Sequence, residues 1–301
     1  MLKKIRIFSL SLLFFASPTL ANVNFEFDVL DKSPKIGETL KIDIHCNRRI
    51  INPSATFAGR SWTVTYLKKK GFMYHYVLYA GISRYLQPKT YKCVITLPLK
   101  HSSFTKTVTF DIKESQFPYG TVSLPKTKTD LANNKNQLSI ESKLISKKFN
   151  SKTQPGTNYK FKTTFMLPAK GNFSSTFGKY RKYKGTNKLS SKHSGLDIAN
   201  ITGTKIVASN DGTVILSEPL KSHGMSIMID HGFGIKTIYN HMSKLLVKTG
   251  DIVKRGQLIG KMGTTGISTG PHLHWGIGVQ NVRVDPLHWV NTNGLYNELT
   301  N

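Results

Sequence analysis

The stretch that decides the fold of the C-terminal half is GPHLHWGIG, residues 270–278. It has the apolar character of a buried strand, and in a strand residues i and i+2 point to the same face. His272 and His274 therefore share one face, while Leu273 points to the other. Two imidazoles buried on one face need polar partners, because each ring carries two polar nitrogens. A metal site would meet this need if further ligands come from elsewhere in the chain.

A second stretch, HSGLD at residues 193–197, offers such ligands. His193 and Asp197 are an imidazole and a carboxylate, which bind zinc at ~2.0–2.2 Å. Together with one histidine of the first stretch they make three protein ligands. Three ligands and one open position are typical of catalytic zinc, whereas structural zinc sites are closed by four protein ligands. A further histidine, His241 in YNHMS, belongs to the same half of the chain.

From about Thr164 the chain becomes rich in glycine, and its apolar runs are short, as in GTVILSE, SIMIDHG and IKTIYNHM. Alternation within these runs is typical of strands, and no long helix fits between Phe165 and Val290. Gly195, Gly263, Gly266 and Gly270 would permit tight turns or a close backbone approach. We therefore predict a glycine-rich, largely antiparallel β-domain over residues 164–290, with a metal at the base of an open groove.

These motifs occur in uninterrupted order and together resemble those of the lysostaphin/LytM-type zinc metallopeptidases, which are endopeptidases of bacterial peptidoglycan. The resemblance covers about residues 165–290 and implies a β-sheet fold of the duplicated hybrid motif type with one zinc ion per chain. The stretches that carry it are HSGLDIA (193–199), ASNDGTVI (208–215), IDHGFGIKTIYNHMS (229–243), GDIVKRGQLIGKMGTTGISTGPHLHWGI (250–277) and VDPL (284–287).

The resemblance also implies roles for single residues. His193, Asp197 and His274 would be the metal ligands, and His272 and His241 the catalytic histidines. The sequence has no H-E-x-x-H motif, so the glutamate base of helical zinc proteases is absent and a histidine is expected to act as the base. Which of the two catalytic histidines does so stays open at this point.

The N-terminal residues indicate export. Residues 1–21, MLKKIRIFSLSLLFFASPTLA, combine a basic start, a short apolar run and small residues before an expected cut after Ala21. No other apolar run approaches the ~20 residues of a spanning helix, so no integral membrane span is expected. The resemblance and this signal together predict a periplasmic protein of a Gram-negative envelope.

The composition points to a polyanionic partner. The chain of 301 residues holds 43 basic and 16 acidic residues, a formal net charge of +27. Such a charge suits nucleic acid, anionic lipid or acidic cell-wall polymers. Export argues against nucleic acid, so the expected partner is peptidoglycan, with other wall enzymes as further candidates.

Short alternating runs over residues 22–115 predict a β-sandwich of immunoglobulin type. Cys46 and Cys93 fall in two of its predicted strands, so a disulfide between them is plausible in an exported chain. Residues 116–163 are predicted to be a linker with one amphipathic helix that packs on a domain, and residues 291–301 a C-terminal tail. The linker helix would be capped by Asp130 and would present apolar residues at helical spacing, namely Leu131, Leu138, Ile145 and Phe149.

The leading functional hypothesis is a zinc endopeptidase that cuts peptide cross-links in peptidoglycan and contributes to wall remodelling, growth or cell shape. The D-alanyl–diaminopimelate bond is favoured by analogy with Gram-negative organisation. A non-catalytic activator of a wall amidase is the alternative, because some proteins of this type have lost the zinc ligands. A plain wall-binding module would explain the charge but not the five site residues.

Overall fold

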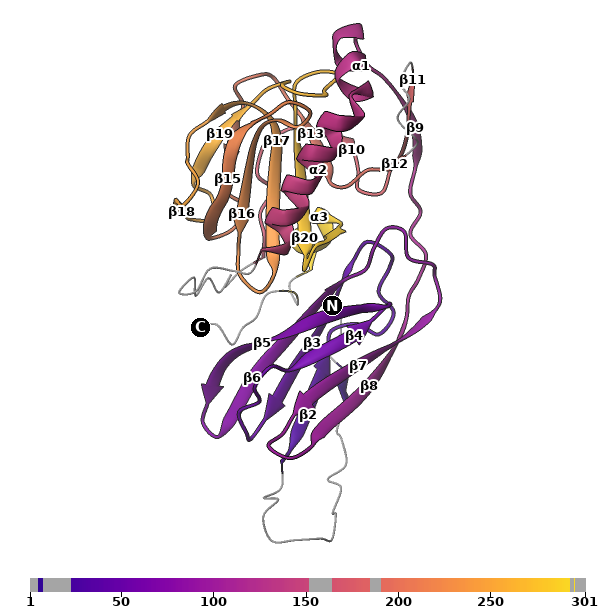
Figure 1. Ribbon diagram of the computed structural model, residues 1–301, viewed down its shortest axis with the longest axis vertical. Coiled ribbons are helices and arrows are strands. Elements are labelled where there is room, and N and C mark those ends of the chain that lie inside the picture. Colours follow the sequence, from indigo (N-terminus) through magenta and orange to yellow (C-terminus); the bar gives the residue numbers. More distant parts are fainter. Residues whose placement is uncertain (1–4, 8–22, 152–163, 185–190, 293–294, 296–301) are drawn as a thin grey trace. The chain divides into compact units, whose positions relative to one another are not determined.

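The computed structural model describes residues 5–7, 23–151, 164–184, 191–292 and 295 (Figure 1). The chain forms two compact units, divided between Glu114 and Ser115. The expected export signal, residues 1–21, lies outside the described residues except for Ile5–Ile7, and most of the predicted tail, 291–301, lies outside them as well. No helix in the described ranges is long and apolar enough to cross a membrane.

The first unit is an antiparallel β-structure, in agreement with the predicted all-β class. One long strand, β5 (Arg60–Lys70), pairs with two neighbours: its residues 60–63 pair with β4 (Ser54–Phe57) and its residues 64–70 with β6 (Met73–Gly81). The immunoglobulin-type topology stays a prediction. In hydrogen-bonded order the strands are β1 (Ile5–Ile7), β2 (Phe25–Val29), β3 (Thr39–Cys46), β6 (Met73–Gly81), β5 (Arg60–Lys70), β4 (Ser54–Phe57), β7 (Thr90–Pro98) and β8 (Ser103–Asp111).

The two cysteines do not form the disulfide that their even number suggested. Both thiols are free and buried. Cys46 at the end of β3 directs its sulfur to the carbonyl of Arg48, at 2.6 Å. Burial raises the pKa of Cys93 in β7 to about 12, so this thiol stays protonated at neutral pH. In the hydrogen-bonded order three strands separate β3, which holds Cys46, from β7, which holds Cys93.

The second unit begins with one short strand and two helices, where a linker with a single helix was expected: β9 (Tyr119–Ser123), α1 (Lys126–Asn133) and α2 (Lys135–Asn150). Pro125 precedes α1, and its fixed φ suits the start of a helix. Asp130 lies inside α1 and is not a cap. Asn134 separates the helices and caps α2 by accepting a hydrogen bond from the Gln137 amide at 3.0 Å.

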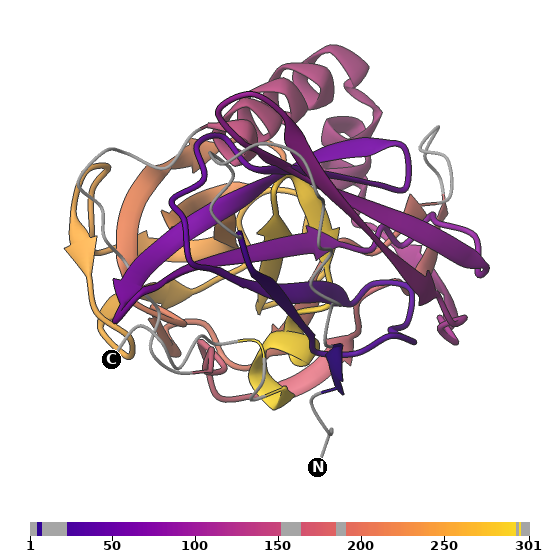
Figure 2. The same cartoon turned by 90° about the horizontal axis from the view of Figure 1, so that it is seen from below.

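Helix α2 packs on the C-terminal sheet, as the apolar spacing indicated (Figures 1 and 2). Ile145 and Phe149, one helical turn apart, are buried against Leu216, Met228 and Ile238 of the sheet. The helix is therefore part of the second unit and shares its hydrophobic core.

Two lysines add polar contacts between α2 and the sheet. Lys148 donates to the carbonyl of Ile215 at 2.7 Å. Lys236 reaches the last turn from the sheet side and donates to the carbonyls of Phe149 and Ser151, at 3.2 and 2.7 Å. Carbonyls at the end of a helix have no partner within it, so the buried ammonium group of Lys236 satisfies them and interacts favourably with the helix dipole.

The sheet of the second unit is antiparallel and glycine-rich, as predicted. Its main path runs through β10 (Asn172–Ser175), β13 (Leu196–Ala199), β20 (His272–Val279), β17 (Ile235–Leu245), β16 (Gly224–Asp230), β15 (Gly212–Leu220) and β18 (Ile252–Val253). Three strands pair beside this path, β14 (Lys205–Val207), β19 (Leu258–Met262) and β21 (Val282–Val284), and a short helix follows, α3 (Pro286–Asn291).

A separate three-stranded sheet joins the start of this unit to its C-terminal part. Its order is β12 (Ser191–Lys192), β11 (Tyr180–Lys184) and β9, and β9 runs parallel to β11. The segment before the helices is thus hydrogen-bonded to a strand that precedes the HSGLD motif.

Candidate active site

Strand pairing brings the three predicted metal ligands together. β13 and β20 are antiparallel neighbours, and their register places Asp197 directly opposite His274. His193 enters from the turn between β12 and β13. The Oδ1 atom of Asp197 lies 3.0 Å from Nε2 of His193 and 2.9 Å from Nδ1 of His274. The two ring nitrogens are themselves 2.9 Å apart, so three ligand atoms converge on one point.

The chemistry of this cluster fits a zinc ion. His193 donates its Nδ1 proton to the carbonyl of Thr176 at 2.9 Å, which leaves the lone pair of Nε2 facing the other two atoms. All three side chains are buried. Two imidazole nitrogens and one carboxylate oxygen, held close together away from water, form a donor set that zinc prefers.

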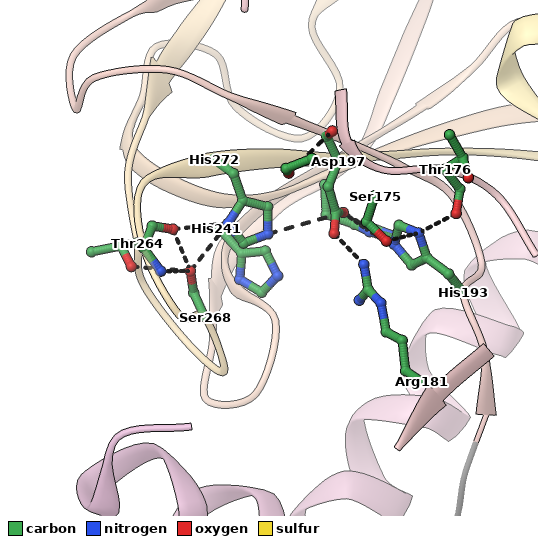
Figure 3. A network of polar contacts seen from close by, with 12 residues as sticks. Ser175, Thr176, Arg181, His193, Asp197, His241, Thr264, Ser268 and His272 are labelled. Atoms are coloured by element: carbon green, nitrogen blue, oxygen red, sulfur yellow. Dashed lines mark hydrogen bonds and ion pairs between the residues drawn. The ribbon is translucent and has the colours of Figure 1, made fainter. Parts of the chain in front are cut away.

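The charges around Asp197 keep it ionised. Burial alone would raise its pKa, but its contacts with His193 and His274 hold the pKa well below its usual range. Arg181 of β11 pairs with the second carboxylate oxygen, Oδ2 (Figure 3). Burial lowers the pKa of His274 to about 3, so its imidazole is neutral at neutral pH and able to bind a metal.

Gly195, between the first two ligands, meets the close approach that the sequence suggested. A Cβ atom there would lie 2.4 Å from the carbonyl oxygen of Trp275 and 2.9 Å from Cε1 of His274. Contacts this short do not occur in folded proteins, so only glycine lets the HSGLD turn lie against β20.

His272 lies beside the cluster on the same face of β20 as His274, as the strand period predicts, and Leu273 is buried on the other face. The Nδ1 atom of His272 is 2.9 Å from the carbonyl oxygen of Gly270 and 3.2 Å from the hydroxyl of Ser268. A ring that donates its Nδ1 proton to a carbonyl has its acceptor at Nε2. This Nε2 atom is 4.0 Å from Oδ1 of Asp197.

His241 reaches the same place from β17. Its ring centroid is 4.7 Å from that of His272. Its backbone has a φ of 63°, in the left-handed region that a residue with a side chain rarely adopts. Such a conformation costs roughly 1–2 kcal/mol, so the surrounding structure must hold it. Its Nδ1 atom donates to the carbonyl of Thr265 at 2.8 Å, which again leaves Nε2 as the acceptor.

The electrostatics favour a neutral His241. Burial lowers its pKa well below 6.5, and the neighbouring rings of His272 and His274 lower it further. A neutral imidazole with a free Nε2 atom is able to accept a proton from water or from substrate.

Three of the five predicted residues line a groove of ≈ 610 Å³. Asp197, His241 and His272 are among its lining residues, and one of its walls is formed by residues 120–124 of β9 and the turn after it. Residues 267–271, which precede β20, form another part of the wall. Figure 3 shows Arg181 and the labelled histidines around Asp197. The groove therefore gives access to Asp197, His241 and His272.

Several contacts at this site were not foreseen from the sequence. Arg181 stands in the basic run KYRKYK, and its pairing with Asp197 has no local signature. The carbonyls of Thr176 and Thr265 orient two imidazoles through the backbone, which any residue type could supply. His231, next to the motif, lies in a separate buried network in which it contacts the Asp211 carbonyl at 2.7 Å and the Thr237 hydroxyl at 2.8 Å.

Comparisons with known proteins agree with this geometry. A crystal structure of a peptidase M23 protein from Pseudomonas aeruginosa is 25% identical, covers 80% of this chain and 88% of its own, and has a TM-score of 0.56. Peptidoglycan DD-endopeptidase ShyB of Vibrio cholerae is 40% identical over 114 residues, which is 38% of this chain and 26% of that protein. An uncharacterized metalloprotease of Haemophilus influenzae is 38% identical over 124 residues, 41% of this chain and 26% of that protein.

The matched part thus spans about a quarter of the length of these two relatives. The sequence profile of peptidase family M23 matches residues 191–286, the segment that holds His193, Asp197, His241, His272 and His274. The five site residues therefore all lie in the segment that matches peptidase family M23.

Proposed function

We propose that this chain is a zinc-dependent endopeptidase that hydrolyses peptide cross-links in bacterial peptidoglycan, with one zinc ion per chain. The observation that carries the proposal is the convergence of three ligand atoms, no more than 3.0 Å apart, beside two further histidines in a groove. The match to family M23 and the similarity to proteins named DD-endopeptidases support it.

His193, Asp197 and His274 would hold the metal. When bound there, zinc would supply Lewis-acid chemistry, which polarises a carbonyl and makes water more acidic. The chain itself supplies the proton transfer. His241 and His272 both present an unprotonated Nε2 atom, so either is able to take a proton as general base. The other, once it carries a proton at Nε2, would donate a hydrogen bond to the oxyanion.

The favoured bond is D-alanyl–diaminopimelate. This specificity comes from the relatives, since three of the Vibrio cholerae proteins are named peptidoglycan DD-endopeptidases. The net charge of +27 suits a polymer whose stem peptides carry carboxylates. We further propose that residues 1–21 direct export, that the protein acts in the periplasm, and that it contributes to wall growth or cell shape.

Digestion of purified sacculi tests the proposal. The full chain after residue 21 should release soluble fragments, and mass analysis of these fragments identifies the bond that is cut. A chelator or the substitution His274→Ala should abolish release, and added zinc should restore the chelated wild type. Release that survives both treatments would contradict a metal-dependent endopeptidase.

The alternative of a non-catalytic activator is less well supported, because all three ligands and both histidines are retained. It predicts that the chain alone releases nothing from sacculi, while an added wall amidase becomes more active. The same digestion, run with and without an amidase, separates the two functions.

A further inference from the structure

We propose that Glu141, on helix α2, is a positioning residue for His241, so that a helix outside the matched M23 segment belongs to the catalytic unit. This inference rests on the proposed function, since it assigns His241 a role in proton transfer. It concerns a residue that acts through others and does not itself touch substrate.

Glu141 is a buried carboxylate with both oxygens in use. It is 2% exposed. The backbone amide of Ser222 donates to its two oxygens, at 3.1 and 3.0 Å, and the Ser222 hydroxyl donates to Oε2. Nδ1 of His223 lies 3.0 Å from Oε2, and the side-chain amide of Gln137 donates to Oε1 at 3.0 Å. Helix α2 is therefore hydrogen-bonded through Glu141 to the turn between β15 and β16.

That turn holds the backbone of His241. The amide of His241 donates to the carbonyl of His223 at 3.0 Å. This is the residue whose φ of 63° needs support from its surroundings. Ser222 bonds Glu141, and the next residue, His223, holds the strained backbone of His241.

The same turn also holds the segment that orients the His241 ring. The carbonyl of Ser222 accepts a hydrogen bond from the Ile267 amide at 2.8 Å. Gly266 lies so close that a Cβ atom there would be 2.6 Å from the Ser222 oxygen. Within this segment, the carbonyl of Thr265 receives the Nδ1 proton of His241 at 2.8 Å.

Both the main chain and the imidazole of His241 therefore depend on residues 222–223, which Glu141 fixes. The contacts that link the two residues run from Glu141 to the β15–β16 turn, from the turn to the Thr265 segment, and from both to His241. A displacement of this turn would move the Nε2 atom relative to the substrate bond, and small misplacements of a catalytic group cost large factors in rate.

A role limited to docking the helix would not need a buried carboxylate. The apolar contacts of Ile145 and Phe149 and the hydrogen bonds of Lys148 and Lys236 already attach α2 to the sheet. Burial raises the pKa of Glu141, but the hydrogen bonds from His223 and Ser222 outweigh it and leave the pKa well below 4.5, so the group is charged. A buried charge is costly, and it is retained here at the turn that carries His241.

The test compares Glu141→Gln with the matched control Lys148→Met in the full chain after residue 21. Lys148 lies on the same helix and bonds the same sheet, but its partner is the carbonyl of Ile215, outside the turn. Three quantities are measured on the zinc-loaded proteins: the ring ¹H–¹⁵N signals of His241, assigned with His241→Gln; kcat and KM on sacculus fragments; and the metal content.

We expect Glu141→Gln to shift the His241 ring signals and to lower kcat about tenfold with KM within about twofold, at unchanged zinc content. Lys148→Met should leave the ring signals and kcat as in the wild type, whatever it does to thermal stability. Ser222→Ala, which removes only the hydroxyl contact, should shift the ring signals in the same direction by less.

The proposal is overturned if Glu141→Gln lowers thermal stability alone and the ring signals and kcat match those of the control. If Glu141→Gln does not fold, the Ser222→Ala signals decide, and unchanged signals overturn it. Should the wild type cut no wall fragment, the proposed function fails, yet the ring signals still test the positioning of His241 independently.

Discussion

Among the described residues, each unit has a cluster of the same composition, two histidines and one aspartate. In the first unit, His45 and His75 stand directly opposite each other on β3 and β6, and Asp28 lies on β2. In the second unit the cluster is His193, Asp197 and His274. Only the second has the arrangement of a metal site, and the difference lies in which atoms face each other.

In the first cluster the contacts form a line. Nδ1 of His45 lies 2.6 Å from Nδ1 of His75, while the other nitrogen of His45, Nε2, faces Asp28 at 3.3 Å. In the second cluster all three ligand atoms face one another within 3.0 Å. Residue types and proximity are thus insufficient for a metal site. One nitrogen of each ring must be directed inward, and in His193 the carbonyl of Thr176 holds the other nitrogen.

The sharpest way to break this comparison is to remove one residue from each cluster. His274→Ala should lower the zinc content from about one ion per chain to near zero and wall cleavage by about 10³-fold, because zinc contributes several kcal/mol to the reaction. His75→Ala should change neither. Elemental analysis and digestion of sacculi measure both. Zinc lost from His75→Ala, or kept by His274→Ala, would reverse the assignment of the two clusters.

The second expected effect separates metal binding from proton transfer. His241→Ala and His272→Ala should each lower cleavage by about 10²–10⁴-fold while the zinc content stays near one ion per chain. The reason is that these rings present Nε2 to the groove without joining the three-atom cluster. Loss of metal in either variant would make that histidine a ligand, and retention of full activity in both would leave the reaction without a base.

A smaller effect is expected from the glycine that lets the ligands approach. Gly195→Ala places a methyl group against the Trp275 carbonyl and the His274 ring, and we expect zinc affinity to fall about tenfold. Gly270→Ala is the matched control, because a Cβ atom there meets nothing within 4 Å. Competition with a zinc-binding dye measures both. Equal affinities in the two variants would show that the close approach at Gly195 is not required.

The smallest effect concerns a buried histidine that belongs to neither cluster. Burial lowers the pKa of His231 to about 4, from 6.5. Between these values the unfolded chain binds a proton at His231 that the folded chain does not. The free energy of unfolding therefore falls as the pH drops from 6.5 to about 4, and the contribution of His231 is complete above pH 6.5. His231→Gln should reduce this slope by about one proton.

Urea unfolding of the metal-free protein at several pH values measures the slope. The metal is removed because zinc binding depends on pH and would add to the slope. His101→Gln serves as control because His101 is exposed. If His231→Gln keeps the wild-type slope while His101→Gln alters it, the burial of His231 is not what makes the protein sensitive to acid.

The parts of the site that depend on local periodicity could be predicted from the sequence. A strand repeats every two residues, so His272 and His274 share a face whatever the rest of the fold does. That Asp197 stands opposite His274 depends on the register between two strands far apart in the chain. Spacing alone contains no such information, and it entered through the resemblance to the family.

Other features depend on competition between similar signals. Asp130 and Asn134 are both good caps, and the structure uses only Asn134, because a helical turn forms earlier, after Pro125. Glu141 has the spacing of the apolar face, four residues before Ile145, but a charged residue predicts exposure, and its burial depends on hydrogen bonds from the distant β15–β16 turn. The free cysteines show the same limit, since an even count says nothing about which sulfur atoms meet.

The docking of α2 has a practical consequence for anyone who prepares the C-terminal half by itself. A fragment that starts at Thr164 keeps every residue of the M23 match but uncovers Leu216, Met228 and Ile238, an apolar patch that favours aggregation. It would also strip the Lys236 ammonium of its two carbonyl acceptors. A fragment that starts at Ser115 keeps the helix, and with it the cover over these apolar residues.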